Sequence, residues 1–269
     1  NLKQLMGHLG GLKDCAVSPD ENYIISASID STLRVWNKDT GTTLLVLEGH
    51  QGTVNGCDVH PQGTMIASAS VDGTIRLWDM LTGKLLYILE GHTDSVSRCA
   101  FSPDGQLLLS ASSDHTLRLW NINTGFCVRT YRGHTDAVRD CAFAADTTSR
   151  MLFSASSDHT LKMWDRDSGA IVYTFTGHSG EVMSVDCSQV DTVIASSSTD
   201  GTVRVWDYVS RRETHKFQTH QSGVLTVKFT PDGQQVACGS WDRTLQIWNI
   251  EAGKSVYELK GHKGGINGC

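Results

Sequence analysis

The chain has 269 residues, of which 39% are hydrophobic and 19% are charged, and its formal net charge is −6 at pH 7. Both charge signs are interspersed along the chain, so it has no basic stripe of the kind that nucleic acid requires. Its apolar runs fall far short of the roughly 18 residues that cross a bilayer, so we expect neither nucleic-acid binding nor membrane insertion.

The dipeptide Gly-His recurs about every 42 residues, which is a period typical of stacked repeats. The pairs begin at Gly7, Gly49, Gly91, Gly133, Gly177 and Gly261, and Thr219-His220 falls in phase with them. Six of these pairs are followed by a phased tryptophan, namely Trp36, Trp78, Trp120, Trp164, Trp206 and Trp248. We therefore interpret residues 1–269 as one domain with repeats at about 7–48, 49–90, 91–132, 133–176, 177–218 and 219–260.

Four short strands are predicted in the repeat that follows His92. An apolar-rich strand at 96–101 leads to Ser-Pro-Asp-Gly, a turn in which Pro presets its own φ and Gly accepts a positive φ. A second strand at 106–112, a third at 116–120 and a fourth at 126–131 follow, separated by turns at Asp114 and at 123–125. Because no segment has a sustained helical period, each repeat is predicted to be a four-stranded antiparallel meander.

Repeats of this kind bury their faces by stacking side by side, which predicts a β-propeller. Residues 1–6 would supply a fourth strand and residues 264–269 a first strand of a partial seventh blade. We expect the protein to continue beyond Cys269 and to be part of a longer chain or complex. The alternative is a self-contained ring of six blades, which would leave two strands surplus.

These motifs resemble the WD-repeat family over the whole chain. In that family a His, a strand Ser, a turn Asp and the Trp form a hydrogen-bonded tetrad in each blade. The resemblance implies the tetrads His8-Ser26-Asp30-Trp36, His50-Ser68-Asp72-Trp78, His92-Ser110-Asp114-Trp120, His134-Ser154-Asp158-Trp164 and His178-Ser196-Asp200-Trp206. The sixth copy keeps His220, Asp242 and Trp248, but Cys238 replaces the Ser. A thiol is a weak donor and acceptor, so this network is expected to be partly unsatisfied. The sixth blade is therefore expected to be the least well stabilised of the six.

The recurring His, Ser and Asp could also be taken for the triad of a hydrolase. Five identical catalytic sets in one chain are not expected, and the resemblance gives these residues a structural role. We therefore expect no catalytic residues, no cofactor and no metal site, and we predict that the protein is not an enzyme.

The cysteines favour the same structural interpretation. Cys15, Cys57, Cys99, Cys141 and Cys269 share a repeat position with Val185 and Val227, which is the pattern of a small buried apolar site. Buried, reduced thiols predict an intracellular, cytoplasmic protein, with the nucleus as a further compartment.

Function is expected where the repeats differ, chiefly on loops and at strand ends. In WD propellers two positions of each repeat commonly face the narrower opening, where peptides bind. This implies the candidate partner-binding residues Lys13, Ile29, Asn55, Val71, Ser97, Arg139, Met183, Leu225 and Trp241. Trp241 is the sharpest candidate, because an exposed Trp is a typical anchor. Alternatively, its ring packs on a neighbouring loop.

The leading hypothesis for function is a noncatalytic scaffold that binds proteins or peptides. Segments such as Val54-Asn55-Gly56-Cys57 are also similar to the WD arrays of STAND-type signalling ATPases, where the propeller senses a ligand and restrains the ATPase. A third hypothesis is a substrate receptor of a ubiquitin ligase. The Trp-Asp-x-Arg motif of such receptors is not matched here, since Trp78-Asp79, for example, is followed by Met80-Leu81.

Overall fold

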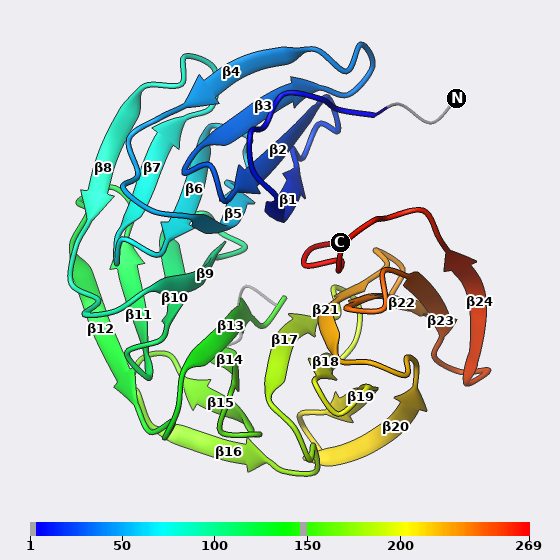
Figure 1. The fold of residues 1–269 in the computed structure, drawn as a ribbon. Coiled ribbons are helices and arrows are strands. Elements are labelled where there is room, and N and C mark those ends of the chain that lie inside the picture. The colour runs from blue at the N-terminus through cyan, green and yellow to red at the C-terminus, as the bar shows by residue number, and fades with distance from the viewer. Residues whose placement is uncertain (1–3, 146–149) are drawn as a thin grey trace. The chain divides into compact units, whose positions relative to one another are not determined.

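The computed structural model describes residues 4–145 and 150–269, and these residues form 24 strands and no helix (Figure 1). The strands make six four-stranded antiparallel sheets, in each of which neighbours in sequence are neighbours in space. We call these sheets blades 1 to 6 in chain order. The predicted fold class of four-stranded antiparallel blades is confirmed, with one blade for each complete repeat.

The chain divides into two compact units, residues 1–130 and 131–269, with the boundary inside the last strand of blade 3. Blade 1 contains β1 (Leu12–Val17), β2 (Tyr23–Ser28), β3 (Leu33–Asn37) and β4 (Thr43–Leu47). Blade 2 contains β5 (Val54–Val59), β6 (Met65–Ser70), β7 (Ile75–Asp79) and β8 (Leu85–Leu89). Blade 3 contains β9 (Val96–Phe101), β10 (Leu107–Ser112), β11 (Thr116–Asn121) and β12 (Cys127–Arg132).

The second unit holds the remaining three blades. Blade 4 contains β13 (Val138–Phe143), β14 (Met151–Ser156), β15 (Leu161–Asp165) and β16 (Ile171–Phe175). Blade 5 contains β17 (Val182–Cys187), β18 (Val193–Ser198), β19 (Thr202–Asp207) and β20 (Arg212–Gln218). Blade 6 contains β21 (Val224–Phe229), β22 (Gln235–Ser240), β23 (Leu245–Asn249) and β24 (Lys254–Leu259).

Within each unit, neighbouring blades bury apolar faces against each other. In the first unit, Ile25 and Leu33 of blade 1 join Val54 and Ile66 of blade 2 in one buried cluster. The alternation of strands explains this arrangement, because residues two apart on a strand point to the same face. The core therefore lies between the blades, and the ends of the strands and their loops are left for function.

Aspartates in the first strands add polar links between the blades of the first unit. A carboxylate oxygen of Asp14 accepts the backbone N–H of Cys57 at 3.0 Å, and one of Asp58 accepts that of Phe101 at 2.7 Å. Asp14 also forms an ion pair with Arg98. These carboxylates satisfy backbone donors of the next blade, and the sequence analysis did not anticipate them.

The second unit contains the same kind of hydrogen bond between neighbouring blades. Asp140 accepts the backbone N–H of Val185 at 3.1 Å, and Asp186 accepts that of Phe229 at 2.8 Å. The other carboxylate oxygen of Asp186 accepts the ammonium of Lys228 at 2.8 Å. An aspartate on the first strand thus bonds to the first strand of the next blade at both junctions of this unit.

The structure does not show the expected seventh blade. Residues 4–6 and 264–269 form no strand, and residues 1–3 lie outside the described residues. The C-terminal segment nevertheless lies against blade 6, where Ile266 is buried and its backbone N–H donates to the carbonyl of Ser240 at 3.0 Å. The Sγ of Cys269 lies 3.8 Å from the carbonyl of Ala237, which matches the position of Cys57 against Ile25 of blade 1. A seventh blade stays a prediction.

Candidate functional site

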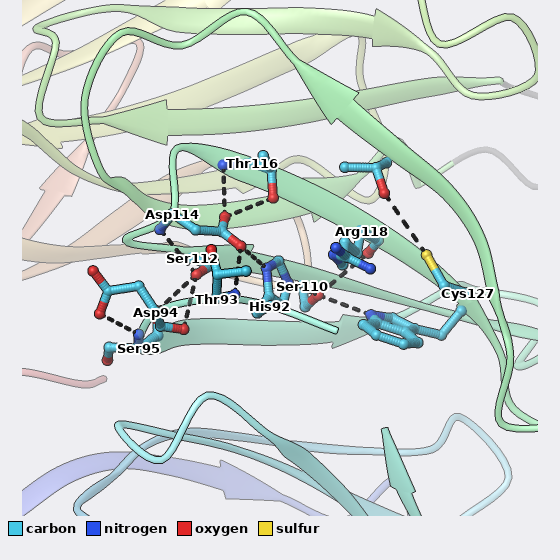
Figure 2. A network of polar contacts seen from close by, with 12 residues as sticks. His92, Thr93, Asp94, Ser95, Ser110, Ser112, Asp114, Thr116, Arg118 and Cys127 are labelled. Atoms are coloured by element: carbon cyan, nitrogen blue, oxygen red, sulfur yellow. Dashed lines mark hydrogen bonds and ion pairs between the residues drawn. The ribbon is translucent and has the colours of Figure 1, made fainter. Parts of the chain in front are cut away.

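The recurring His, Ser, Asp and Trp are joined by hydrogen bonds inside blade 3 (Figure 2). The Nδ1 of His92 lies 2.8 Å from a carboxylate oxygen of Asp114, and its Nε2 lies 2.8 Å from the hydroxyl of Ser110. The indole N–H of Trp120 donates to the same hydroxyl at 2.9 Å. Because the carboxylate can only accept, Nδ1 carries the proton and Nε2 accepts from Ser110. The network ties the Gly-His turn to β10 and β11.

The four side chains make the same contacts in blades 1, 2, 4 and 5. Burial by itself raises the pKa of Asp72 in blade 2, but hydrogen bonds led by that from Thr74 outweigh it and lower this pKa to about 2. Burial lowers the pKa of His50, and the neighbouring carboxylate only partly offsets this. At neutral pH the pair is therefore a carboxylate and a neutral imidazole.

This geometry is structural and does not suit a hydrolase. Ser110 is fully buried, and its hydroxyl is already engaged by the imidazole and the indole. A nucleophilic serine has to face a bound substrate, with donors for the developing oxyanion close by. The phased residues consequently build the frame of each blade.

Blade 6 rearranges the network around Cys238. The Nδ1 of His220 still bonds to Asp242 at 2.8 Å, but its Nε2 now lies 3.5 Å from the sulfur of Cys238. The indole N–H of Trp248 donates to the side-chain oxygen of Gln246 at 2.9 Å. Contrary to the expectation that the network is partly unsatisfied, this donor has a partner, because Gln246 supplies the acceptor that the thiol cannot.

One structural position accounts for six of the candidate binding residues. In blade 3, Val96 pairs with Ser112 and Arg98 pairs with Ala111, so Ser97 lies in a β-bulge between them. Equivalent bulges fall at Lys13, Asn55, Arg139, Met183 and Leu225. A bulge takes one side chain out of the regular alternation and re-aims it, and bulges are common beside functional sites.

The other three candidates lie in the turn after the second strand. The backbone N–H groups of Ile29, Val71 and Trp241 donate to carbonyls just before the first strand, at 3.0, 2.9 and 3.1 Å. In each of these blades the turn residue and the bulge residue therefore lie at the same end. The sequence positions thus correspond to one end of the blade, within each unit taken by itself.

In the first unit this end presents aliphatic surface. Ile29 and Val71 are about half exposed, at 50% and 49%. Lys13 and Ser97 are partly exposed. The amide nitrogen of Asn55 donates to the hydroxyl of Ser95 at 3.1 Å and to the carbonyl of Val96 at 3.0 Å, so Asn55 links blade 2 to blade 3.

In the second unit Arg139 is already paired. Its Nε donates to the hydroxyl of Ser157 at 2.7 Å, and its Nη2 donates to the carboxylate of Glu181 at 3.2 Å. Ser157 donates to the same carboxylate at 2.8 Å. A partner's carboxylate would have to compete with Glu181 for this guanidinium.

Trp241 combines exposure with a fixed position. Its side chain is 53% exposed, and Leu225 beside it is only 7% exposed, so Trp241 supplies most of the apolar surface here. A Cβ added to Gly223 would lie 2.8 Å from the ring, and one added to Gly265 would lie 3.1 Å from it. Met183 is partly buried. The ring is thus both packed on its neighbours and open to a partner.

Sequence analysis missed a cavity of about 470 Å³ at the rim of blade 6, lined in part by Thr219, Gln246 and Glu258. The sequence signal for this cavity is that Thr219 and Gln246 replace the Gly and the basic residue that the other repeats carry at these two positions.

Among residues 4–145 and 150–269, no three His, Cys, Asp or Glu side chains converge as a metal-ligand set, and no helix there could span a membrane.

All eight cysteines are free of disulfide bonds. Cys57, Cys99 and Cys141 are buried as predicted for their shared position, whereas Cys269 is only partly buried and Cys15 is exposed. Cys15 lies on a face of blade 1 that no other blade of the first unit covers, so the prediction of burial was wrong for this residue. Burial raises the pKa of the Cys187 thiol to about 11 and that of Cys238 to about 12, so both stay protonated at neutral pH.

Comparison with known proteins identifies the repeats. The family model described as WD domain, G-beta repeat, matches residues 1–37, 41–79, 83–121, 125–165, 169–207 and 211–249. The small ribosomal subunit protein RACK1 of Neurospora crassa is 49% identical over 41 residues, which cover 15% of this chain and 13% of that protein. MST50-interacting protein 11 of Pyricularia oryzae is also 49% identical over 41 residues, with the same coverage of 15% and 13%. Each match therefore spans only a small part of these relatives.

Proposed function

Because the chain belongs to the WD-repeat family of β-propellers, typical protein-interaction scaffolds, we propose that it is a noncatalytic scaffold for protein or peptide partners. The partners bind at the end of the blades where the bulge and turn residues lie. The name of MST50-interacting protein 11 describes a protein that interacts with another protein, which supports this proposal. The match to that relative is short, so the proposal names a class of partner and no individual protein.

The observation that carries the proposal is the exposed and fixed ring of Trp241. Tryptophan is enriched among residues that dominate binding energy, because its large ring buries much surface and its N–H can still donate. The ring already lies against Gly223 and Gly265 before a partner arrives. Little conformational entropy is then lost on binding, which makes this position a good anchor.

We also propose an intracellular, cytoplasmic setting and a role in signalling for this scaffold. The free state of all eight cysteines supports the compartment, since disulfides are rare in the cytosol. The STAND-type sensing domain and the ubiquitin-ligase receptor are more specific forms of the same role, and both stay predictions.

The test is capture of partners from a cell extract by the immobilised chain. Trp241→Ala is expected to weaken a specifically captured protein by about 30-fold, which corresponds to a hot-spot loss of about 2 kcal/mol. Phe126→Ala is the matched control, because this aromatic ring is also exposed but lies outside the candidate set. Unchanged capture by both Trp241→Ala and Arg139→Ala would exclude the proposed face.

A further inference from the structure

In blades 1, 2, 3 and 5 an arginine of the third strand is packed between the tryptophan and the glycine of Gly-His, as Arg34 is in blade 1. The guanidinium carbon of Arg76 lies 5.9 Å from the ring centroid of Trp78. A Cβ added to Gly49, whose φ is +145°, would lie 2.5 Å from the Nη1 of Arg76. Arg118 and Arg204 take the same position. The guanidinium thus fills the space beside the Gly-His turn, and the positive φ of Gly49 favours glycine there.

Blade 6 lacks both partners of this packing. Gln246 stands at the arginine position and Thr219 at the glycine position. Gln246 is shorter than arginine, and its side-chain oxygen is held by the indole N–H of Trp248 at 2.9 Å. The cavity of about 470 Å³ lies beside these two residues, at the rim where blade 5 ends and blade 6 begins. Blade 6 therefore has an open cavity at the position that a guanidinium fills in blades 1, 2, 3 and 5.

The polar lining of this cavity suits a cation. Glu258 pairs with Gln246 across β23 and β24 and contributes a carboxylate, and Asp242 contributes a second one. The one ammonium in the lining, that of Lys260, lies 3.0 Å from the carboxylate of Glu258, and its side chain is 67% exposed. Exposed ion pairs of this kind contribute little and exchange readily, so Lys260 is easily displaced.

We propose that this cavity receives an arginine side chain of a partner protein. A planar guanidinium can donate to Glu258 and to the side-chain oxygen of Gln246 together, and it is more weakly hydrated than an ammonium. Because Thr219 occupies the place of the glycine, the incoming group sits farther out than Arg76 does, closer to Glu258. The inference rests on the proposed function, since the arginine belongs to a bound protein segment.

A second cavity connects this site with Trp241. It has a volume of about 410 Å³, is lined by Trp241 and His262, and shares Asp242, Thr244 and Lys260 with the first cavity. A peptide that places an apolar residue on the indole can therefore extend its arginine into the rim cavity. The partner segment is accordingly basic at one end and apolar at the other.

The experiment is an NMR titration of the full chain with a capped pentapeptide that carries one central arginine between glycines. Saturable shifts are expected with arginine, and at least about tenfold weaker binding with citrulline, which keeps the shape but loses the charge. Glu258→Gln should weaken binding about tenfold or more, because it removes the carboxylate that accepts the guanidinium. Glu251→Gln, on an exposed turn of the same blade, should leave binding unchanged.

A double variant tests whether an arginine of the chain itself can fill the cavity, as it fills the equivalent space in other blades. Thr219→Gly with Gln246→Arg recreates the pair that blades 1, 2, 3 and 5 already fold with, so the chain's own guanidinium should fill the cavity and abolish binding. The absence of saturable shifts, equal binding of citrulline, or undiminished binding by Glu258→Gln or by the double variant would overturn the inference. Trp241→Ala separates the two proposals, because it should reduce capture of a protein partner and leave the affinity for the single-arginine peptide unchanged.

Discussion

Two buried serines give a paired test of how hydrogen bonding stabilises the blades. Ser110 and Ser197 are both fully buried, and each can be changed to Ala without enlarging the side chain. The hydroxyl of Ser110 accepts from Trp120 and bonds to His92, whereas the hydroxyl of Ser197 has no hydrogen-bond partner among the described residues. Serine to alanine should therefore lower the free energy of unfolding at Ser110 and raise it at Ser197.

The magnitudes follow from the number of groups left unpaired. Ser110→Ala leaves the indole N–H of Trp120 and the Nε2 of His92 buried without partners, and each unpaired group costs about 1–3 kcal/mol. The expected destabilisation is about 2–5 kcal/mol, a large share of the roughly 5–15 kcal/mol that folded domains have. Ser197→Ala removes a polar group that is buried without compensation, so it should stabilise by about 1 kcal/mol. Other blades already carry Ala27, Ala69, Ala111 and Ala155 at this position.

The assay is equilibrium unfolding in urea, followed by tryptophan fluorescence, on both variants and the parent chain. The Ser110→Ala midpoint should fall and the Ser197→Ala midpoint should rise, with the slope of the free energy against urea unchanged. Equal shifts of the two midpoints, or a lower midpoint for Ser197→Ala, would refute the reasoning that hydrogen-bond partners decide whether the substitution stabilises or destabilises the chain.

Three further outcomes can be measured. Burial lowers the folded-state pKa values of His50, His134 and His178 below 6.5, so the unfolded chain binds more protons below that pH. The free energy of unfolding should then decline on acidification through about pH 6.5, and equal urea midpoints at about pH 7.5 and 5.5 would contradict this. Asp186→Ala removes the carboxylate that accepts the Phe229 N–H at 2.8 Å, so it should lower the free energy of unfolding by about 1–3 kcal/mol and speed hydrogen exchange at Phe229. Asp191→Ala, at an exposed residue, is the control and should change neither quantity. Iodoacetamide at neutral pH should label exposed Cys15 and Cys127 well before Cys57, whose pKa is raised by burial, and mass spectrometry after partial labelling would reveal any other order.

The blades could be predicted from the sequence because their determinants are local. The turn at Ser102-Pro103-Asp104-Gly105 and the alternation at 116–120 act within a few residues, and the repeat then multiplies the signal. The positions of the bulge residues were also predictable, since the resemblance placed them directly after the first apolar residue of the inner strand. The pairing register of the strands did not have to be predicted for each blade separately, because it recurs from one blade to the next.

Contacts between repeats were not predictable in the same way. Asp14 and Asp58 lie two positions apart in the repeat frame, yet each bonds to the next blade, and only the packed structure brings donor and acceptor together. The pairing of Arg139 with Glu181 has the same origin, since the two residues belong to different blades. Leu225 occupies a candidate position but is buried, and the C-terminal segment lies beside it, since a Cβ added to Gly265 would be 3.7 Å from its side chain.

The residues at which blade 6 departs from the other blades lie around its Thr219-His220 turn. A Cβ at Gly49 would lie 2.5 Å from the Nη1 of Arg76, and the φ of Gly49 is +145°, so glycine suits the turn beside the arginine. In blade 6 Gln246 stands at the arginine position and Thr219 at the glycine position. Gln246 also accepts the N–H of Trp248, which removes the need for a serine and admits Cys238. Two of the three changed residues, Thr219 and Gln246, line the rim cavity. The indole of Trp248 thus keeps a hydrogen-bond partner although Cys238 has replaced the serine of the other blades.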